Sequence, residues 1–191
     1  VNTMTVTGEE KLAATNTDAF GFVEALRARA PDWDPISGPA VVLGAGGASR
    51  AVLVALQDLG VPEIRIVNRT PERSQALADE FGAPLVSLPW KDRASVLRDV
   101  GLLVNTTTLG MQGQPPLDLS LECLPQHAVV NDIVYAPLHT PLLQAAKNNG
   151  NVIVDGLEML LHQARPGFQA WFGREPDVSD ELRRFVGEDL L

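Results

Sequence analysis

The feature that most constrains the fold is an apolar run that breaks into glycines and then continues as a helical pattern, over residues 41–56. The β-branched pair Val41 and Val42 suits a buried parallel strand, and apolar residues recur at helical spacing after the glycines. The start of a helix leaves backbone N–H groups unpaired, and the helix dipole favours an anion there. This order of strand, glycine turn and helix predicts a phosphate-binding turn, and the alternative is a tight turn that binds nothing.

The residues of the turn have separate expected tasks. Gly44 and Gly46 would let the chain turn tightly and bring its backbone against a pyrophosphate. The small side chains after them would let the helix pack close to the strand. Ser49 stands where the dinucleotide-binding fingerprint has Gly or Ala, so the motif alone is incomplete.

The composition is that of an ordinary globular protein. The chain has 191 residues, of which 45% are hydrophobic and 20% are charged. A formal net charge of -9 argues against nucleic acid or an anionic membrane as a partner. The single cysteine, Cys123, fits a reducing compartment, and no apolar run has the length of a membrane span. We therefore expect a cytoplasmic protein without a metal site.

Strands and helices alternate along most of the chain. The first two strands, 1–6 and 12–15, are predicted to form a hairpin with its tip at 8–11, and a helix follows from Asp18 to about Ala30. Two strands alone are marginal, so the hairpin is expected to belong to a larger sheet. The alternation predicts an α/β fold, a Rossmann-like doubly wound parallel sheet with flanking helices. Beyond residue 56, strands are expected at 64–67, 85–88, 101–104, 129–134 and 151–154, and helices at 71–81, 94–98, 140–150, 156–171 and 179–188.

The residue type at the end of the second strand of this sheet indicates whether such a domain binds NAD or NADP. An NAD-binding unit has Asp or Glu there, and an NADP-binding unit has a basic residue that meets the extra phosphate. Here the strand is followed by Arg69 and Thr70, with Arg73 one turn later and no carboxylate at its end. Guanidinium groups suit a phosphate, and the alternative is two solvated arginines on a surface loop. The sequence favours NADP as the cofactor.

Five motifs occur in order along the chain: Asn2-Thr3 with residues 16–21, Asn68-Arg69-Thr70, the stretch 105–111, the stretch 132–137 with 140–142, and the stretch 156–160 with Gln163. Together they resemble the shikimate dehydrogenase family and its quinate/shikimate relatives. The resemblance covers residues 1 to about 173 and implies an enzyme that reversibly reduces 3-dehydroshikimate to shikimate with NADPH, in the route to aromatic amino acids. A quinate-preferring relative, glutamyl-tRNA reductase and a non-catalytic NADP-binding domain are the alternatives.

The resemblance also implies roles for single residues. Asp18 matches the aspartate that binds the substrate and partners the catalytic lysine, and this makes it the one catalytic residue expected here. The implied substrate-binding residues are Asn2, Asp18, Tyr135 and Gln163. The implied cofactor-binding residues are Gly44, Ala45, Gly46, Gly47 and Ala48 at the pyrophosphate, Asn68, Arg69, Thr70 and Arg73 at the adenosine phosphate, Asn105, Thr106 and Thr107 at the nicotinamide ribose, and Gly156 and Met159 at the nicotinamide. Taken singly, Asn2 as a strand residue, Asp18 as a helix cap and Met159 as core filling are competing interpretations.

One departure from the family is large. In the family a substrate domain precedes the position of Asn2 and carries the catalytic lysine, whereas Lys11, Lys91 and Lys147 do not lie in that lysine's motif. We therefore expect a fragment that is inactive alone. Its expected parts are a substrate-domain remnant at 1–18, a linker helix at 19–31, an NADP-binding domain at 32–155, and C-terminal helices at 156–191 that pack back toward the substrate domain. A homodimer, and the choice between shikimate and quinate, stay open.

Overall fold

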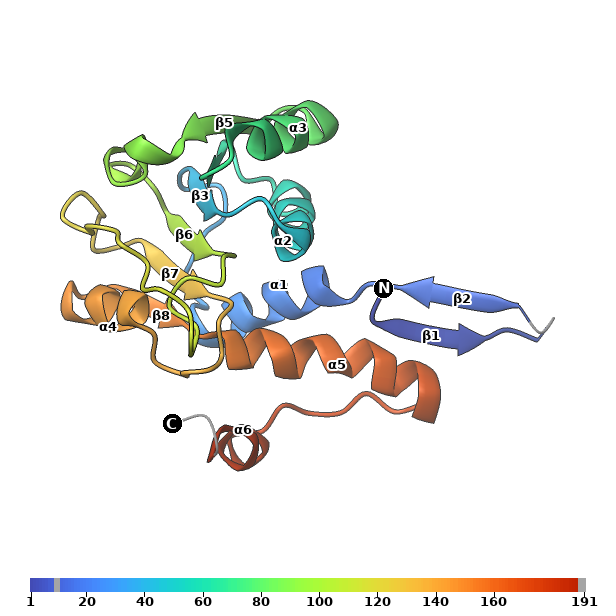
Figure 1. The fold of residues 1–191 in the computed structure, drawn as a ribbon. Coiled ribbons are helices and arrows are strands. Elements are labelled where there is room, and N and C mark those ends of the chain that lie inside the picture. The colour runs from blue at the N-terminus through green and yellow to red at the C-terminus, as the bar shows by residue number, and fades with distance from the viewer. Residues whose placement is uncertain (9–10, 189–191) are drawn as a thin grey trace.

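A six-stranded parallel sheet forms the centre of the computed structural model, which describes residues 1–8 and 11–188 (Figure 1). This confirms the predicted fold class. The strand order is β5-β4-β3-β6-β7-β8, so the direction of winding reverses between β3 and β6. Ligands of such sheets bind outside the carboxyl ends of the strands at this reversal. The strands are β3 (Ala40–Leu43), β4 (Ile64–Asn68), β5 (Leu85–Pro89), β6 (Leu102–Asn105), β7 (Val129–Asp132) and β8 (Val152–Val154).

Both faces of the sheet are covered, which is why its strands are almost uniformly apolar. Ala40 and Val42 of β3 face a core that they share with helices α1 (Asp18–Arg29), α2 (Gly47–Asp58) and α3 (Pro71–Phe81). Val41 and Leu43, which point to the opposite face, pack with α4 (Pro141–Asn148) and with apolar residues of the irregular stretches before and after β6, 90–101 and 106–124.

Two predicted elements differ from the structure. The helix expected at 94–98 is replaced by two short 3₁₀ turns, Trp90–Asp92 and Ser95–Leu97. The strand expected at 129–134 ends at Asp132, because the side chain of Asp132 accepts the Val134 N–H at 3.1 Å and takes the backbone out of the sheet ladder.

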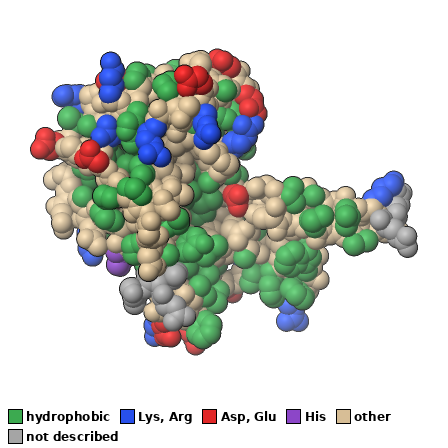
Figure 2. Space-filling view, in the orientation of Figure 1, with side chains coloured by type: hydrophobic (Ala, Val, Ile, Leu, Met, Phe, Trp, Pro, Cys, Tyr) green, Lys and Arg blue, Asp and Glu red, His purple; other side chains and the backbone are tan. Residues whose placement is uncertain are grey.

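The predicted hairpin projects from the body of the molecule (Figure 1). Its strands, β1 (Thr3–Val6) and β2 (Leu12–Thr15), are antiparallel, and the predicted tip residues Glu9 and Glu10 lie outside the described residues. Met4, Val6 and Leu12 are exposed, and Figure 2 shows hydrophobic side chains along the hairpin. This two-stranded sheet therefore keeps apolar surface open to solvent.

The C-terminal helices connect the hairpin to the sheet. The long helix α5 (Gly156–Phe172) packs along α1, and Trp171 near its end donates its indole N–H to the Met4 carbonyl at 2.9 Å. The chain then reverses, and α6 (Asp180–Gly187) lies against the beginning of α5, where Gly187 meets Leu157. The end of the predicted segment, 189–191, lies outside the described residues, and the division into domains stays a prediction. Within 1–8 and 11–188, no helix combines the length and the apolar character needed to cross a membrane.

Candidate functional site

The glycine turn ends at a helix start that no side chain caps. Gly46 is the N-cap of α2, and no side chain there accepts a hydrogen bond from the first turn. A Cβ added at Gly46 would meet nothing within 4 Å, so open space adjoins the helix start. Gly44 differs, since its φ of +104° favours glycine and a Cβ there would lie 2.8 Å from Thr106 Oγ1. The turn therefore offers an anion unpaired N–H groups and room to approach them.

Ser49, the departure from the dinucleotide fingerprint, has a structural task. Its side chain is fully buried, and its hydroxyl donates to the Gly46 carbonyl at 2.7 Å. This hydrogen bond joins the first turn of α2 to the glycine turn. The serine thus fits the packed position that the fingerprint reserves for a small residue.

A cavity of about 270 Å³ lies at the carboxyl ends of the central strands and joins the glycine turn to the two predicted arginines. The arginines come from the end of β4 and from the first turn of α3. Figure 2 shows Lys and Arg side chains on the part of the molecule that carries β5 and α3, where Asp and Glu side chains also lie. The cavity is lined by Gly44, Ala45, Gly46, Asn68, Arg69, Arg73, Trp90, Thr106, Thr107 and Thr108.

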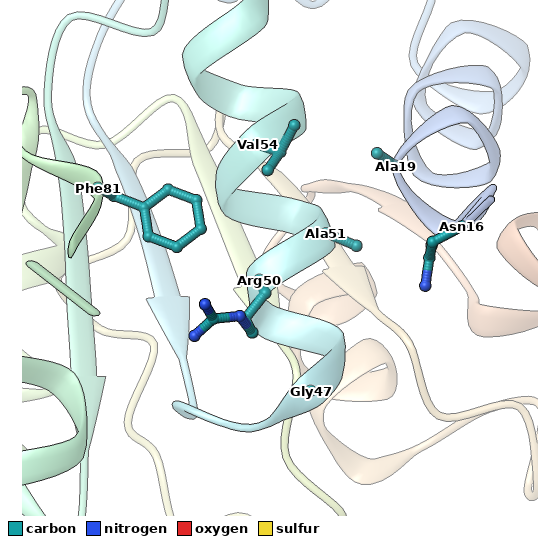
Figure 3. Close-up of a pocket in the computed structure, with 7 residues that line it drawn as sticks. All are labelled: Asn16, Ala19, Gly47, Arg50, Ala51, Val54 and Phe81. Carbon is teal, nitrogen blue, oxygen red and sulfur yellow. The ribbon is translucent and has the colours of Figure 1, made fainter. Parts of the chain in front are cut away.

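The predicted residues Gly47, Ala48 and Thr70 lie at the helix starts beside this cavity. Gly47 lines a neighbouring cavity of about 450 Å³ between α1 and α2, where Figure 3 shows it at the beginning of α2. Ala48 follows in the first turn of α2. Thr70 is the N-cap of α3, and its carbonyl accepts a hydrogen bond from Asn68 Nδ2 at 2.8 Å. Asn68 therefore shapes the turn that presents Arg69.

Asn105 holds the loop after β6 and is itself inaccessible. Its side chain is fully buried and donates to Asp132 Oδ1 at 2.9 Å and to the Leu109 carbonyl at 3.2 Å. Its Oδ1 accepts from the Thr107 backbone N–H and hydroxyl, and the Thr106 hydroxyl donates to the Leu43 carbonyl at 2.7 Å. The structure thus places Thr106 and Thr107 at the cavity and Asn105 behind them.

Asp132 carries a buried carboxyl group at the centre of the hydrogen bonds that hold the loops after β6 and β7. It accepts hydrogen bonds from Asn105, from the Val134 N–H and, at 2.7 Å, from the Thr140 hydroxyl. Burial raises the pKa of Asp132 to about 6, against the opposing effect of these hydrogen bonds. The loops after β6 and β7 are therefore fixed to each other by one carboxyl group.

A second polar cluster joins three of the predicted substrate residues. Asn2 Nδ2 donates to Asp18 Oδ1 at 2.9 Å and to Gln163 Oε1 at 3.1 Å. Asn16 Nδ2 donates to the other Asp18 oxygen at 3.1 Å, and the Thr17 hydroxyl bridges Asn2 Oδ1 and the Gln163 carbonyl. The hairpin, α1 and α5 thus each contribute a polar side chain to one place.

The other three predicted residues stand apart from that cluster. Tyr135, in the loop after β7, is 44% exposed, and in the described ranges it makes no hydrogen bond to Asn2, Asp18 or Gln163. Gly156 packs so closely on the loop after β7 that an added Cβ would lie 2.3 Å from the Ile133 carbonyl oxygen. Met159 is buried in the core between α1 and the sheet. Their implied contacts with substrate and nicotinamide stay predictions.

Sequence reasoning missed Trp90 and Thr108 in the cavity, and Asp132 and Thr140 beneath it. A signal existed for Trp90, because it lies two residues after the strand predicted at 85–88 and so near the ligand-binding edge of the parallel sheet. Asp132 and Thr140 lie in a motif of the family resemblance, but no role was assigned to either. Thr140 was also predicted to begin a helix, which it does, since its hydroxyl accepts the Leu143 N–H.

Comparison with known proteins agrees with this geometry. The model of the family described as Shikimate / quinate 5-dehydrogenase matches residues 35–110, and that of the Shikimate 5'-dehydrogenase C-terminal domain matches residues 156–180. A protein of Paramagnetospirillum magneticum named Shikimate dehydrogenase (NADP(+)) is 59% identical over 97% of this chain and 67% of its own length. The chain belongs to the shikimate dehydrogenase family. A second protein of that name, from Nitrobacter hamburgensis, is 58% identical over 94% of the chain and 62% of its own length.

Solved structures of the family superpose on most of the chain. The shikimate 5-dehydrogenase of Thermus thermophilus in complex with NADP(H) and shikimate is 40% identical with a TM-score of 0.78, over 96% of this chain and 66% of that one. The quinate dehydrogenase of Corynebacterium glutamicum in complex with NAD is 30% identical with a TM-score of 0.86, over the same shares. The chain thus spans about two thirds of the length of its shikimate dehydrogenase relatives.

Proposed function

We propose that this chain is the NADP-binding part of a cytoplasmic shikimate dehydrogenase, which reversibly reduces 3-dehydroshikimate to shikimate. The observation that carries the proposal is the cavity that combines the uncapped start of α2 with Arg69 and Arg73. Within the described ranges, its lining includes no carboxylate that would favour the free ribose of NAD. Eight relatives named Shikimate dehydrogenase (NADP(+)) are 49% to 59% identical to the chain.

The residues present fit the proposed cofactor. The backbone N–H groups that follow Gly46 would bind the pyrophosphate, because the space before them is open and no side chain occupies them. Arg69 and Arg73 would bind the 2′-phosphate of the adenosine, and their guanidinium groups match a phosphate in charge and geometry. When bound, NADP supplies the hydride chemistry of the reaction.

The polar cluster at the base of the hairpin would bind the substrate. A polyhydroxylated ring needs several fixed partners, since rejection of close analogues depends on polar groups that a wrong substrate leaves unpaired. Asn2, Asp18 and Gln163 supply amide and carboxylate groups that are already oriented by mutual hydrogen bonds. We include Tyr135 as a fourth contact on the strength of the family resemblance.

Asp18 would act beside a proton-transferring lysine. Oxidation of a carbinol requires a base for the hydroxyl proton. The carboxylate of Asp18 is held by Asn2 and Asn16, while Lys91 lies in the 3₁₀ turn after β5 and Lys147 in α4. Since none of Lys11, Lys91 and Lys147 lies in the lysine motif of the family, we expect the chain alone not to oxidise shikimate at a useful rate.

Calorimetry with NADP and NAD tests the proposal. The chain should bind NADP about tenfold or more tightly than NAD, because charge-assisted contacts to the 2′-phosphate each contribute about 1.5–3 kcal/mol. Arg69→Ala should remove most of the difference, while Arg174→Ala, at an exposed position outside the cavity, should leave it unchanged. Equal affinities for the two dinucleotides would contradict the assignment.

A further inference from the structure

Trp90 leaves the sheet beside the two arginines. Pro89, the last residue of β5, is paired with Asn68, the last residue of β4. The next residues along the two strands, Trp90 and Arg69, therefore emerge together at the carboxyl edge of the sheet, and both line the cavity with Arg73. Within the described part of the chain, Trp90 is the aromatic side chain of this lining.

The indole is held in place by its own surroundings. Trp90 is half-buried and packs against the apolar cluster on the α4 face of the sheet. The Arg93 guanidinium lies 5.1 Å from the ring centroid and donates to the Trp90 carbonyl at 3.2 Å. Arg93 is in turn fixed to Asp118, whose carbonyl accepts from Arg93 Nε at 2.8 Å. A ring fixed in this way loses little conformational freedom when a ligand binds.

The position of the phosphates determines where the base of the dinucleotide must lie. With the pyrophosphate at Gly46 and the 2′-phosphate at Arg69 and Arg73, the adenine is attached to the ribose that carries the 2′-phosphate. The base therefore occupies the same end of the cavity as the two arginines. We propose that the adenine of NADP stacks on the indole of Trp90, which makes Trp90 a specificity-determining residue for an adenine dinucleotide. This inference rests on the proposed binding of NADP.

Fluorescence and calorimetric titration of the 191-residue chain with NADP and with adenosine 2′,5′-bisphosphate tests the stacking. Trp90→Leu keeps an apolar side chain against the core but removes the aromatic plane, and it should weaken both ligands about tenfold, the size expected for one base on one aromatic ring. Trp90→Phe keeps a ring and should bind within about threefold of the parent chain. Melting temperatures of both variants show whether they are folded.

The tryptophan fluorescence gives a second readout. NADP should quench the parent chain and a Trp33→Phe control, because Trp33 lines a different cavity at the end of α1. The Trp90→Phe variant should bind with most of this quenching lost. If a folded Trp90→Leu variant binds NADP within about twofold of the parent, the stacking is wrong while the proposed cofactor stands. If the parent chain binds no NADP, the proposed function fails and the stacking fails with it.

Discussion

Gly21 of α1 packs directly against Gln163 of α5, since a Cβ at Gly21 would lie 2.6 Å from Gln163 Cβ. The same Cβ would lie 2.7 Å from the Met159 carbonyl oxygen, so a side chain at Gly21 would meet backbone as well. This contact sets the spacing between Asp18, at the start of α1, and Gln163 on α5. The polar cluster that both residues share with Asn2 depends on it.

We expect Gly21→Ala to separate the two helices and lower the free energy of unfolding by about 1–2 kcal/mol. Overpacking costs about 1–3 kcal/mol, and the better helix propensity of Ala offsets up to about 1 kcal/mol of that. Chemical denaturation measures the change. Gly47→Ala is the matched helical control, because a Cβ there meets nothing within 4 Å. A Gly21→Ala variant as stable as the parent would show that the crossing is not tightly packed.

We expect Gly46→Ala to weaken NADP binding without lowering the stability of the fold. The φ of Gly46 is -101°, which any residue adopts, and its Cβ would project into open space. The fold should therefore tolerate the methyl group, whereas a pyrophosphate at the start of α2 should not, and we expect NADP affinity to fall about tenfold or more.

The contrasting variant is Gly44→Ala. Here φ is +104° and the added Cβ would lie 2.8 Å from Thr106 Oγ1, so the melting temperature should fall as well as the affinity. Calorimetry and thermal melts of the two variants distinguish these effects. Unchanged NADP binding by the Gly46→Ala variant would place the pyrophosphate elsewhere.

Local sequence patterns predicted the helices and strands of this fold better than they predicted the long-range hydrogen bonds that hold its loops. The glycine turn carries its signal within a few residues, and the structure confirms the helix that follows it. The bond from Asn105 to Asp132 joins residues 27 apart and exists only because β6 and β7 are neighbours in the sheet. No local pattern contains that information.

The cavity with Arg69 and Arg73 could be predicted from local sequence, whereas the cluster of Asn2, Asp18 and Gln163 could not. Arg69 and Arg73 could be interpreted from their place after a strand, since the carboxyl edge of a parallel sheet is where ligands bind. The hydrogen bond between Asn2 and Gln163 spans 161 residues, so these two residues were linked only by the family resemblance. The stretches on either side of β6, 90–101 and 106–124, gave little signal of secondary structure, because they hold two short 3₁₀ turns and otherwise irregular chain.

Asp132 predicts an unusual dependence of stability on pH. Its pKa is raised by burial from 3.8 to about 6, so the folded state binds a proton more tightly than the unfolded state does. The free energy of unfolding therefore receives the full contribution of the protonated group below about pH 4 and loses about 3 kcal/mol as the pH rises to about 6.

Asp132→Asn tests this loss. The amide cannot ionise and can still accept from Asn105 and Val134 while it donates to Thr140. The stability of the variant relative to the parent should rise by about 2 kcal/mol between about pH 4 and pH 7, measured by urea denaturation. Carboxyl groups with lowered pKa values, such as Glu24 and Asp99, are common to both chains and cancel in the difference. A difference that does not change with pH would mean that Asp132 is ionised throughout this range.

Arg183 fastens α6 to the start of α5. Its guanidinium donates to both carboxylate oxygens of Asp155, the N-cap of α5, at 3.1 and 2.6 Å, and lies 2.9 Å from Glu158 Oε1. Glu158 is almost fully buried and also pairs with Arg29 from the end of α1. Loss of one partner of a buried ion pair costs about 3–5 kcal/mol. We expect less for Arg183→Met, about 2 kcal/mol, because Arg29 remains beside Glu158 and the Arg183 side chain is 19% exposed.

The expected result is a lower free energy of unfolding together with early proteolysis between α5 and α6, since the docking of α6 depends on this pair. Arg184→Met is the matched control, because Arg184 is exposed and follows Arg183 on the same helix. Urea denaturation and limited trypsin digestion followed by mass spectrometry measure the two effects. If both methionine variants resemble the parent, apolar contacts such as that of Gly187 with Leu157 hold α6 without the ion pairs.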